Sequence, residues 1–264
     1  LLSGQTSMWI GITLLTQTQG KTLRGLLIFI LAVCLYAVGF MARSEEPFDL
    51  AVTVDWKPYL YINQQGEPDG EDLRLLRRTL KRLGYELNAQ RLPEKRLALE
   101  LKQGEVDVIL GAAYTKAREA QNFYSMPYRR ETIVFGFRFS RNPYFSDVNV
   151  SSLLQQNYLV AVNKSGWFGE DFQRKALDAH DRYLIHAEGT MRRMQLLKMG
   201  RVDAVVGDQK VLEAAAQQLG IDDFKVSKQV IHETRVHFLF SRNRVDKAFM
   251  QRFNQALVAE LTRQ

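Results

Sequence analysis

The chain has 264 residues, of which 46% are hydrophobic and 25% are charged, an ordinary composition for a globular protein. Its formal net charge of +7 is spread along the chain, with no basic block interleaved with aromatic residues, so we expect no nucleic-acid partner. The single cysteine, Cys34, excludes an internal disulfide, although a chain of this size can fold in an oxidising compartment without one.

Residues 1–42 are expected to be an N-terminal extension that contains a secretory signal peptide. Lys21 and Arg24 precede an apolar run, LLIFILAVCLYAVGF at residues 26–40, which has small residues near its end at Ala37 and Gly39. This order is typical of a signal peptide, and the run is short for a membrane-spanning helix. We therefore expect export to the periplasm, with cleavage near residues 40–43. An uncleaved membrane anchor is the alternative.

The first half of the remaining chain alternates strand and helix patterns. A β-branched apolar strand is predicted at residues 50–54, and a leucine-rich amphipathic helix runs from about residue 69 to Gly84. A second helix is expected from Pro93 to Gly104, followed by a buried strand at residues 106–110. Strands that alternate with helices predict the α/β class.

The second half continues the alternation, with a polar segment at residues 140–147 that looks like a boundary. The predicted strands cover residues 133–139, 159–162, 183–186, 202–206, 224–230 and 236–240. The predicted helices cover residues 168–180, 190–200, 208–219 and 245–261.

A repeated sequence, K-x-G-x-V-D-x-[IV]-[LV]-G, occurs at residues 102–111 and again at residues 198–207. We expect it to mark two similar α/β units, each with a strand that ends at the final glycine. In open α/β sheets, ligands bind just beyond the carboxyl ends of the strands. Arg118 follows one copy and Asp208 the other, a pair that suits a small zwitterion held between two lobes. The alternative is that both copies are ordinary helix–strand junctions with solvated charges.

From about residue 47 to residue 264, the chain resembles the periplasmic solute-binding proteins of the polar amino-acid type, which are the bacterial extracellular solute-binding proteins of family 3. Five motifs in order carry this resemblance. They are D-W-x-P-Y at residues 55–59, G-x-D-L at 70–73, G-x-x-x-T-x-x-R at 111–118, F-x-x-x-P-Y at 123–128 and G-x-x-D-A-V-V-G-D at 200–208.

The resemblance implies a two-lobed, type 2 periplasmic-binding fold, in which each lobe has a central sheet flanked by helices. Lobe 1 would comprise residues 45–131 and 234–264, and lobe 2 residues 132–233. Two crossover segments, near residues 129–134 and 231–236, would join the lobes and act as hinges. The protein would be a monomer that binds a polar or charged amino acid and delivers it to the membrane permease of an ATP-driven importer.

The resemblance also assigns roles at the cleft between the lobes. Arg118 would hold the ligand carboxylate, Asp208 would accept from its ammonium, and Trp56 or Tyr59 would pack on its side chain. The other residues expected to contact the ligand are Asp55, Gly111, Ala112, Ala113, Ser165, Gly166 and Trp167. The family commonly has Ser or Thr where this chain has Ala113, so one hydroxyl donor to the carboxylate is missing.

Each of these residues also has a structural explanation. Arg118 can be a solvated residue at a helix start, Asp208 a helix N-cap, Trp56 a core residue and Asp55 a turn cap. We expect both Arg118 and Asp208 to be hydrated when no ligand is bound.

Two other functions remain open at the level of the sequence. An enzyme on the same fold, similar to dehydratases of aromatic amino-acid precursors, would need an acid or base in the cleft, such as Asp55, Glu71 or Glu188. A membrane-tethered ligand sensor is the other alternative. The four histidines are scattered and no metal-ligand spacing stands out, so we expect no metal, no cofactor and no catalytic residue.

Overall fold

The computed structural model describes residues 46–263 apart from 53–54, 94–95, 164–165 and 175–180. Residues 47–264 form one compact unit. The predicted signal peptide and its alternative, a membrane anchor, lie outside the described residues. Among the residues that are described, no helix is both long enough and apolar enough to cross a membrane.

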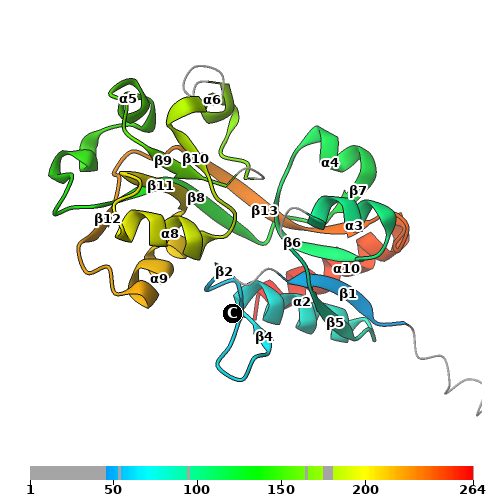
Figure 1. Cartoon of the computed structure of the whole chain (residues 1–264). Coiled ribbons are helices and arrows are strands. Elements are labelled where there is room, and N and C mark those ends of the chain that lie inside the picture. Colours follow the sequence, from blue (N-terminus) through cyan, green and yellow to red (C-terminus); the bar gives the residue numbers. More distant parts are fainter. Residues whose placement is uncertain (1–45, 53–54, 94–95, 164–165, 175–180, 264) are drawn as a thin grey trace, which may run out of the picture. The chain divides into compact units, whose positions relative to one another are not determined.

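A ten-stranded mixed sheet runs through the described part of the chain (Figure 1). The order along its main path is β10-β9-β11-β8-β13-β6-β1-β5, while β12 pairs with β8 and β7 pairs with β13. Its strands are β1 (Phe48–Val52), β5 (Leu87–Arg91), β6 (Val108–Ala113), β7 (Asn122–Tyr124), β8 (Arg129–Arg138), β9 (Val160–Val162), β10 (Leu184–His186), β11 (Ala204–Asp208), β12 (Phe224–Val226) and β13 (His232–Ser241).

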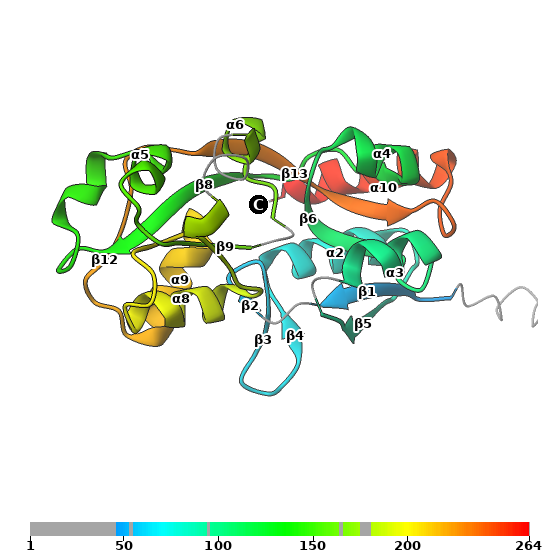
Figure 2. The same cartoon turned by 45° about the horizontal axis from the view of Figure 1, so that its top comes forward.

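The two long strands β8 and β13 pass between two groups of helices and divide the sheet into two lobes (Figure 2). They pair antiparallel, from Arg129 opposite Val236 to Ile133 opposite His232. On one side lie α2 (Glu71–Arg82), α3 (Leu97–Gln103), α4 (Lys116–Gln121) and α10 (Lys247–Leu261). On the other lie α5 (Val150–Gln155), α6 (Glu170–Phe172), α8 (Thr190–Lys198) and α9 (Gln209–Leu219). The predicted α/β, two-lobed fold with two crossover segments is confirmed.

The helix α2 shows why the sequence pattern predicted the first lobe well. Leu73, Leu76 and Leu80 recur at helical spacing and are fully buried. They belong to the same apolar core as Phe48 in β1 and Phe253 in α10. Acidic residues in the first turn and basic residues in the last turn both complement the helix dipole.

The second lobe has its own apolar core. The polar segment at residues 140–147, which looked like a boundary in the sequence, contributes a residue to this core. Part of this segment forms a short 3-10 helix, Pro143–Asp147, in which Phe145 is buried against Phe135 and Phe137. Of the helix expected at residues 168–180, the described residues include α6, which is three residues long, followed by two residues of π-helix.

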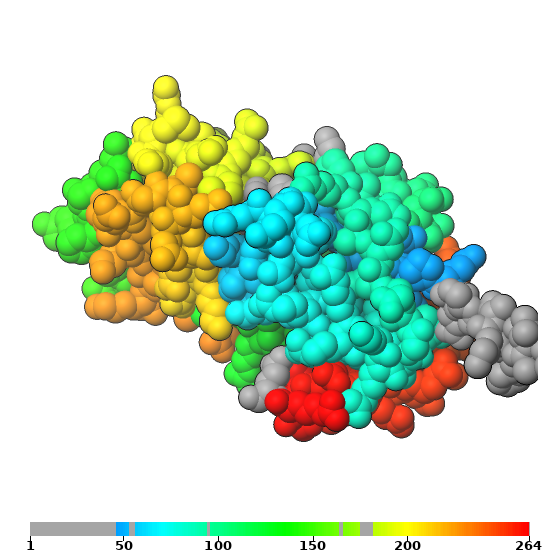
Figure 3. Space-filling model, turned by 90° about the horizontal axis from the view of Figure 1, so that it is seen from below, coloured from blue at the N-terminus to red at the C-terminus, as the bar shows by residue number. Residues whose placement is uncertain are grey.

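A small separate sheet is made of β2 (Asp55–Trp56), β3 (Leu60–Ile62) and β4 (Pro68–Asp69), which lie between β1 and α2 in the sequence. The side chain of Asn63 accepts the backbone N–H groups of Gln65 and Glu67, which closes the turn between β3 and β4. In the space-filling view, this cyan segment adjoins the yellow and orange surface of α8 and α9 in the second lobe (Figure 3).

Candidate functional site

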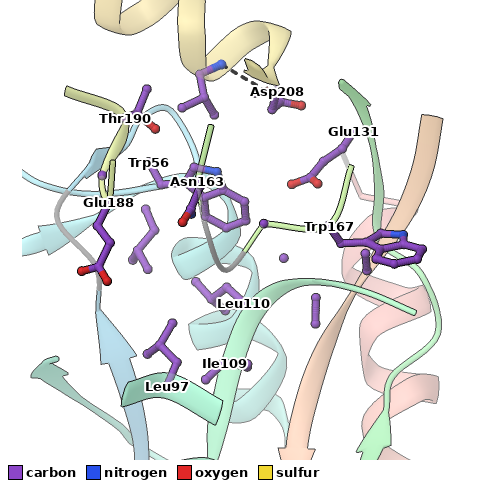
Figure 4. Close-up of a pocket in the computed structure, with 18 of the residues that line it drawn as sticks. Trp56, Leu97, Ile109, Leu110, Glu131, Asn163, Trp167, Glu188, Thr190 and Asp208 are labelled. Carbon is purple, nitrogen blue, oxygen red and sulfur yellow. Dashed lines mark hydrogen bonds between the residues drawn. The ribbon is translucent and has the colours of Figure 1, made fainter. Parts of the chain in front are cut away.

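A cavity of about 560 Å³ lies at the carboxyl ends of the parallel strands in both lobes. From the first lobe, the ends of β1 and β6 reach its wall at Val52 and Ala113. From the second, the wall includes Asn163 after β9, Glu188 after β10 and Asp208 at the end of β11 (Figure 4). This is the edge at which open α/β sheets bind their ligands.

Trp56 forms one wall of this cavity because Gly111 leaves room for it. A Cβ added to Gly111 would lie only 1.7 Å from the Cη2 atom of Trp56. Gly111 also has φ +60°, a conformation that residues with a side chain rarely adopt. The strand β6 continues past Gly111 to Ala113, so the prediction that the strand ends at this glycine is wrong. Ala112 and Ala113 line the same wall and are buried.

Arg118 reaches the cavity from the first turn of α4, a helix that the sequence analysis did not predict. The side chain of Thr115 caps this helix by accepting the backbone N–H of Arg118. The Nη1 atom of Arg118 donates to the carbonyl oxygen of Ala113 at 3.0 Å. No other hydrogen bond of this guanidinium group is found with the described residues, and the side chain is half-buried. The remaining donors are therefore available to a carboxylate.

Asp208 lies on the second-lobe side of the cavity, at the junction of β11 and α9. Its Oδ1 atom accepts the backbone N–H of Val211 at 3.1 Å, so it caps α9. Its side chain is only 7% exposed, which means that the expected hydration of Asp208 is wrong. Burial raises the pKa of Asp208, while backbone N–H groups of Val211, Thr132 and Lys210 oppose this by favouring the ionised form.

Two further predicted residues, Gly166 and Trp167, line the cavity from the segment after β9. Phe168 packs against Gly166, where a Cβ would lie 2.4 Å from its ring, and forms an edge contact with Phe172 in the core. Phe168 therefore anchors the segment that brings Trp167 to the cavity. Ser165, the hydroxyl predicted beside them, lies outside the described residues.

Of the predicted contact residues, Tyr59 is not among the described residues that line the cavity. It is 3% exposed, and the guanidinium carbon of Arg129 lies 3.5 Å from the centre of its ring. Its position supports Arg129 through a cation–π contact. The backbone of Asp55 belongs to β2, and its side chain is outside what the structure describes.

Sequence reasoning missed Glu131, which lines the cavity from β8. It is 8% exposed, and its Oε1 atom accepts from Nη2 of Arg129 at 3.1 Å. Burial raises the pKa of Glu131 to about 7, with Arg129 opposing the shift and Asp208 adding to it. The only available signal was its position in the expected hinge at residues 129–134.

A hydrogen-bond network connects Glu131 to the wall that carries Trp56. The backbone N–H of Gly111 donates to the hydroxyl of Tyr128 at 2.9 Å, and that hydroxyl donates to Asp72 Oδ2 at 2.6 Å. Arg129 donates from Nε to both oxygens of Asp72, at 3.0 and 3.1 Å, while its Nη2 holds Glu131. This network fixes the hinge strand to α2 and to the cavity wall.

Comparison with known proteins identifies this arrangement of elements. The profile of the bacterial extracellular solute-binding proteins, family 3, matches residues 48–262. The chain belongs to this family. A search of curated protein sequences gives no match.

Solved structures share the fold of this solute-binding protein at low sequence identity. Holo ArgBP from T. maritima matches with a TM-score of 0.69 and 22% identity, covering 84% of this chain and 92% of that one. A histidine kinase sensor domain with similarity to periplasmic binding proteins matches with a TM-score of 0.69 and 18% identity, covering 82% and 90%. The ancestral amino acid-binding protein AncCDT-1, a precursor of cyclohexadienyl dehydratase, matches with a TM-score of 0.69 and 19% identity, covering 84% and 91%.

The internal repeat of this solute-binding protein has a structural role that its sequence did not reveal. Asp107 accepts the backbone N–H of Asp49 at 2.8 Å and returns its own backbone N–H to the carbonyl oxygen of Asp49. In the second copy, the Oδ2 atom of Asp203 accepts the backbone N–H of Leu159 at 2.9 Å, and the backbone N–H of Asp203 donates to the carbonyl oxygen of Leu159. The repeated aspartate therefore attaches each copy to the start of the neighbouring strand, at Asp49 in β1 and at Leu159 just before β9, while Arg118 and Asp208 follow the repeat.

Proposed function

We propose that this solute-binding protein binds a free α-amino acid in the cavity between its lobes. The observation that carries the proposal is the presence of Arg118 and Asp208 on opposite lobes of one cavity. An arginine matches the planar carboxylate of an amino acid with two parallel donors. A carboxylate accepts from the ammonium at the other end. Neither interaction requires a metal or a cofactor.

The cavity has the size and the lining that a small zwitterion needs. Its volume of about 560 Å³ lies within the usual range for small-ligand pockets. Trp56 and Trp167 offer aromatic surface, while Leu97, Ile109 and Leu110 add apolar surface (Figure 4). The arginine-bound form of the structurally similar ArgBP favours an amino acid as the ligand.

For the biological role, we propose that the protein is exported to the periplasm and passes its ligand to the permease of an ATP-driven importer. Membership of an extracellular family supports export. Lobe 1 would comprise residues 45–131 and 234–264 and lobe 2 residues 132–233, closing as a monomer about the hinges near residues 129–134 and 231–236. The pairing of those two hinge segments in β8 and β13 supports this division, because both would bend together.

Two alternatives each have one observation in their favour. An enzyme of the dehydratase type is favoured by Glu131, a carboxyl group with a pKa raised by burial inside a cavity, and by the likeness to AncCDT-1. A sensor module is favoured by the likeness to the kinase sensor domain. We prefer a transport receptor because Glu131 is held by Arg129 and so has a structural partner.

A thermal-shift screen of the processed protein against the proteinogenic L-amino acids tests the proposal. A ligand present at 100 times its Kd should stabilise the folded state by about 2.7 kcal/mol. Calorimetry on each positive amino acid should give one site per chain, and analysis of the same mixtures should recover the amino acid unchanged. If no amino acid stabilised the protein, the proposal would be refuted. If an amino acid were converted to another compound, the protein would be an enzyme rather than a binding protein.

A further inference from the structure

The cavity contains one more carboxyl group than the clamp of a zwitterion requires. Besides Asp208, Glu131 lines the cavity and is turned toward its interior (Figure 4). Its Oε1 atom is bonded to Arg129, and its Oε2 atom makes no hydrogen bond with the described residues. A carboxylate oxygen of a cavity-lining residue that has no donor is suited to a donor that arrives with a ligand.

Sheet geometry places Glu131 beside Asp208. Asp208 pairs with Ile133 across the antiparallel strands β11 and β8. Glu131 is two residues from Ile133, so its side chain lies on the same face of the sheet as those of Ile133 and Asp208. Diagonal neighbours of this kind have Cα atoms roughly 7–8 Å apart, a span that one ammonium group between two carboxylates can bridge.

Of the charged groups that act most strongly on Glu131, two are carboxylates, Asp208 and Asp72, and one is a cation, Arg129. Arg129 is shared, because its Nε atom bonds both oxygens of Asp72 while its Nη2 atom bonds Glu131. Asp208 adds a third carboxylate and is capped by backbone groups rather than by a cation. The guanidinium group of Arg129 cannot neutralise all three carboxylates. Either a proton or the cationic group of a ligand can neutralise another one.

We propose that Glu131 is a second ligand of the bound ammonium group, and that binding releases a proton from Glu131. This inference rests on the proposed function, since it assumes an amino acid in the cavity. In the empty protein, Glu131 carries a proton for part of the time near neutral pH. The incoming ammonium group donates to Glu131 Oε2 and to Asp208, and the proton leaves to solvent as the carboxylate forms.

The groups that can influence this proton come from each element packed against β8. They are Arg129 on β8, Tyr128 just before it, Asp72 on α2, Tyr59 after β2, Arg193 on α8, Asp208 on β11, Lys210 on α9 and His232 on β13. Thr234 pairs directly with Glu131, so Glu233 and Arg235 lie on the other face of the sheet. His232 shares the face of Glu131, and its ring packs against Gly169.

The size of the effect follows from the pKa of Glu131, which burial raises to about 7. If the ligand binds only the ionised form, its apparent affinity scales with the ionised fraction, which rises about tenfold from pH 6 to pH 8. At pH 7, binding should release about half a proton per ligand. Losing a hydrogen bond to a charged group should weaken binding by about 10- to 150-fold at pH 8.

The test is calorimetry of the processed protein with L-arginine, L-lysine and L-glutamine, whose α-ammonium groups stay protonated from pH 6 to pH 8. Titration in buffers of different ionisation enthalpy gives the number of protons released. Glu131→Gln removes the proton but keeps an oxygen that accepts from Arg129, and its melting temperature without ligand reports the fold. Glu233→Gln is the matched control, since it removes an exposed glutamate from the same hinge.

We expect the wild type and Glu233→Gln to release about half a proton at pH 7 and to bind about tenfold more tightly at pH 8 than at pH 6. Glu131→Gln should release none and bind with an affinity that does not change with pH. His232 is present in all three proteins, so equal proton release from Glu131→Gln and the wild type would overturn the inference while leaving the proposed function intact. Failure of every amino acid to bind the wild type would overturn both.

Discussion

The indole ring of Trp56 occupies the space that a side chain at residue 111 would need. A Cβ on Gly111 would lie 1.7 Å from Cη2 and 2.5 Å from Cζ3 of Trp56. The same glycine donates its backbone N–H to Tyr128, which belongs to the network that holds Glu131. The position of one aromatic wall of the cavity therefore depends on the absence of a side chain at one residue.

Gly111→Ala should lower both the stability and the ligand affinity of the protein. Gly84→Ala is the matched control, because Gly84 also has positive φ but has no atom within 4 Å of an added Cβ. The control should lose about 1–2 kcal/mol of unfolding free energy from backbone strain alone. Gly111→Ala should lose more, since Trp56 must also move. Urea unfolding and calorimetry with L-arginine measure the two effects. If Gly111→Ala and Gly84→Ala lost the same stability and Gly111→Ala kept its affinity, the prediction would be wrong and Trp56 would be easily displaced.

The stability of the unliganded protein should fall as the pH rises from about 5 to about 8. Burial raises the pKa of Glu131 from 4.5 to about 7, so between these values the folded state binds more protons than the unfolded state. Stability decreases with pH wherever this holds, here by at most about 3 kcal/mol. The pKa values of Asp72 and Asp208 are also raised by burial and act in the same direction.

Melting temperatures across this pH range test that expectation, with Glu131→Gln as the comparison. The variant should show a much weaker pH dependence than the wild type. Asp223, whose pKa is lowered to about 2 chiefly by the Ser140 hydroxyl, contributes stability that is lost only in more acidic solution. A wild-type melting temperature that stays constant or rises between pH 5 and pH 8 would contradict the raised pKa of Glu131.

Local patterns were sufficient for the fold and led to Arg118 and Asp208, which line one cavity, while their role as a clamp remains a prediction. Helical leucine spacing identified α2, and the glycine-rich ends of the two repeats pointed to Arg118 and Asp208. Glu131 could not be found in this way. Its environment depends on Arg129 and on Asp72, which is 57 residues from Arg129, and no local pattern reports that contact. Ser165 and the lobe boundaries remain predictions.

The repeated aspartates should contribute to stability without contributing to affinity. Asp203→Ala removes the acceptor of the Leu159 backbone N–H, and Asp107→Ala removes that of Asp49 together with an ion pair to Arg244. Each substitution should cost about 1–3 kcal/mol of unfolding free energy, because a partly buried donor is left without its partner. Urea unfolding measures this, and Asp203→Asn should recover part of the loss.

Calorimetry below the unfolding transition should give a near wild-type Kd for both aspartate variants. A large loss of affinity in Asp203→Ala, at a temperature where the variant is fully folded, would mean that the repeat belongs to the binding site itself.

The clamp is tested by substitutions that spare the fold. Asp208→Asn is preferable to alanine, because asparagine can still cap α9 at Val211, whereas alanine would also cost about 1 kcal/mol of stability. Arg118→Ala removes the proposed carboxylate donor, and Arg118→Lys keeps the charge but loses the two parallel donors. Leaving one end of the ligand unpaired in a closed cavity should cost about 2–5 kcal/mol, which is about 30- to several-thousand-fold in Kd.

Titration of L-arginine, or of another amino acid found by the thermal-shift screen, measures these effects, with Asp222→Asn as an exposed control on the same lobe. All the variants should melt within a few degrees of the wild type without ligand. Arg118→Ala and Asp208→Asn should lose affinity to a similar extent because each leaves one ligand charge without its partner. Arg118→Lys should fall between Arg118→Ala and the wild type. Near wild-type affinity in both Arg118→Ala and Asp208→Asn would refute the clamp and leave Arg118 as a surface residue of α4 and Asp208 as a helix cap.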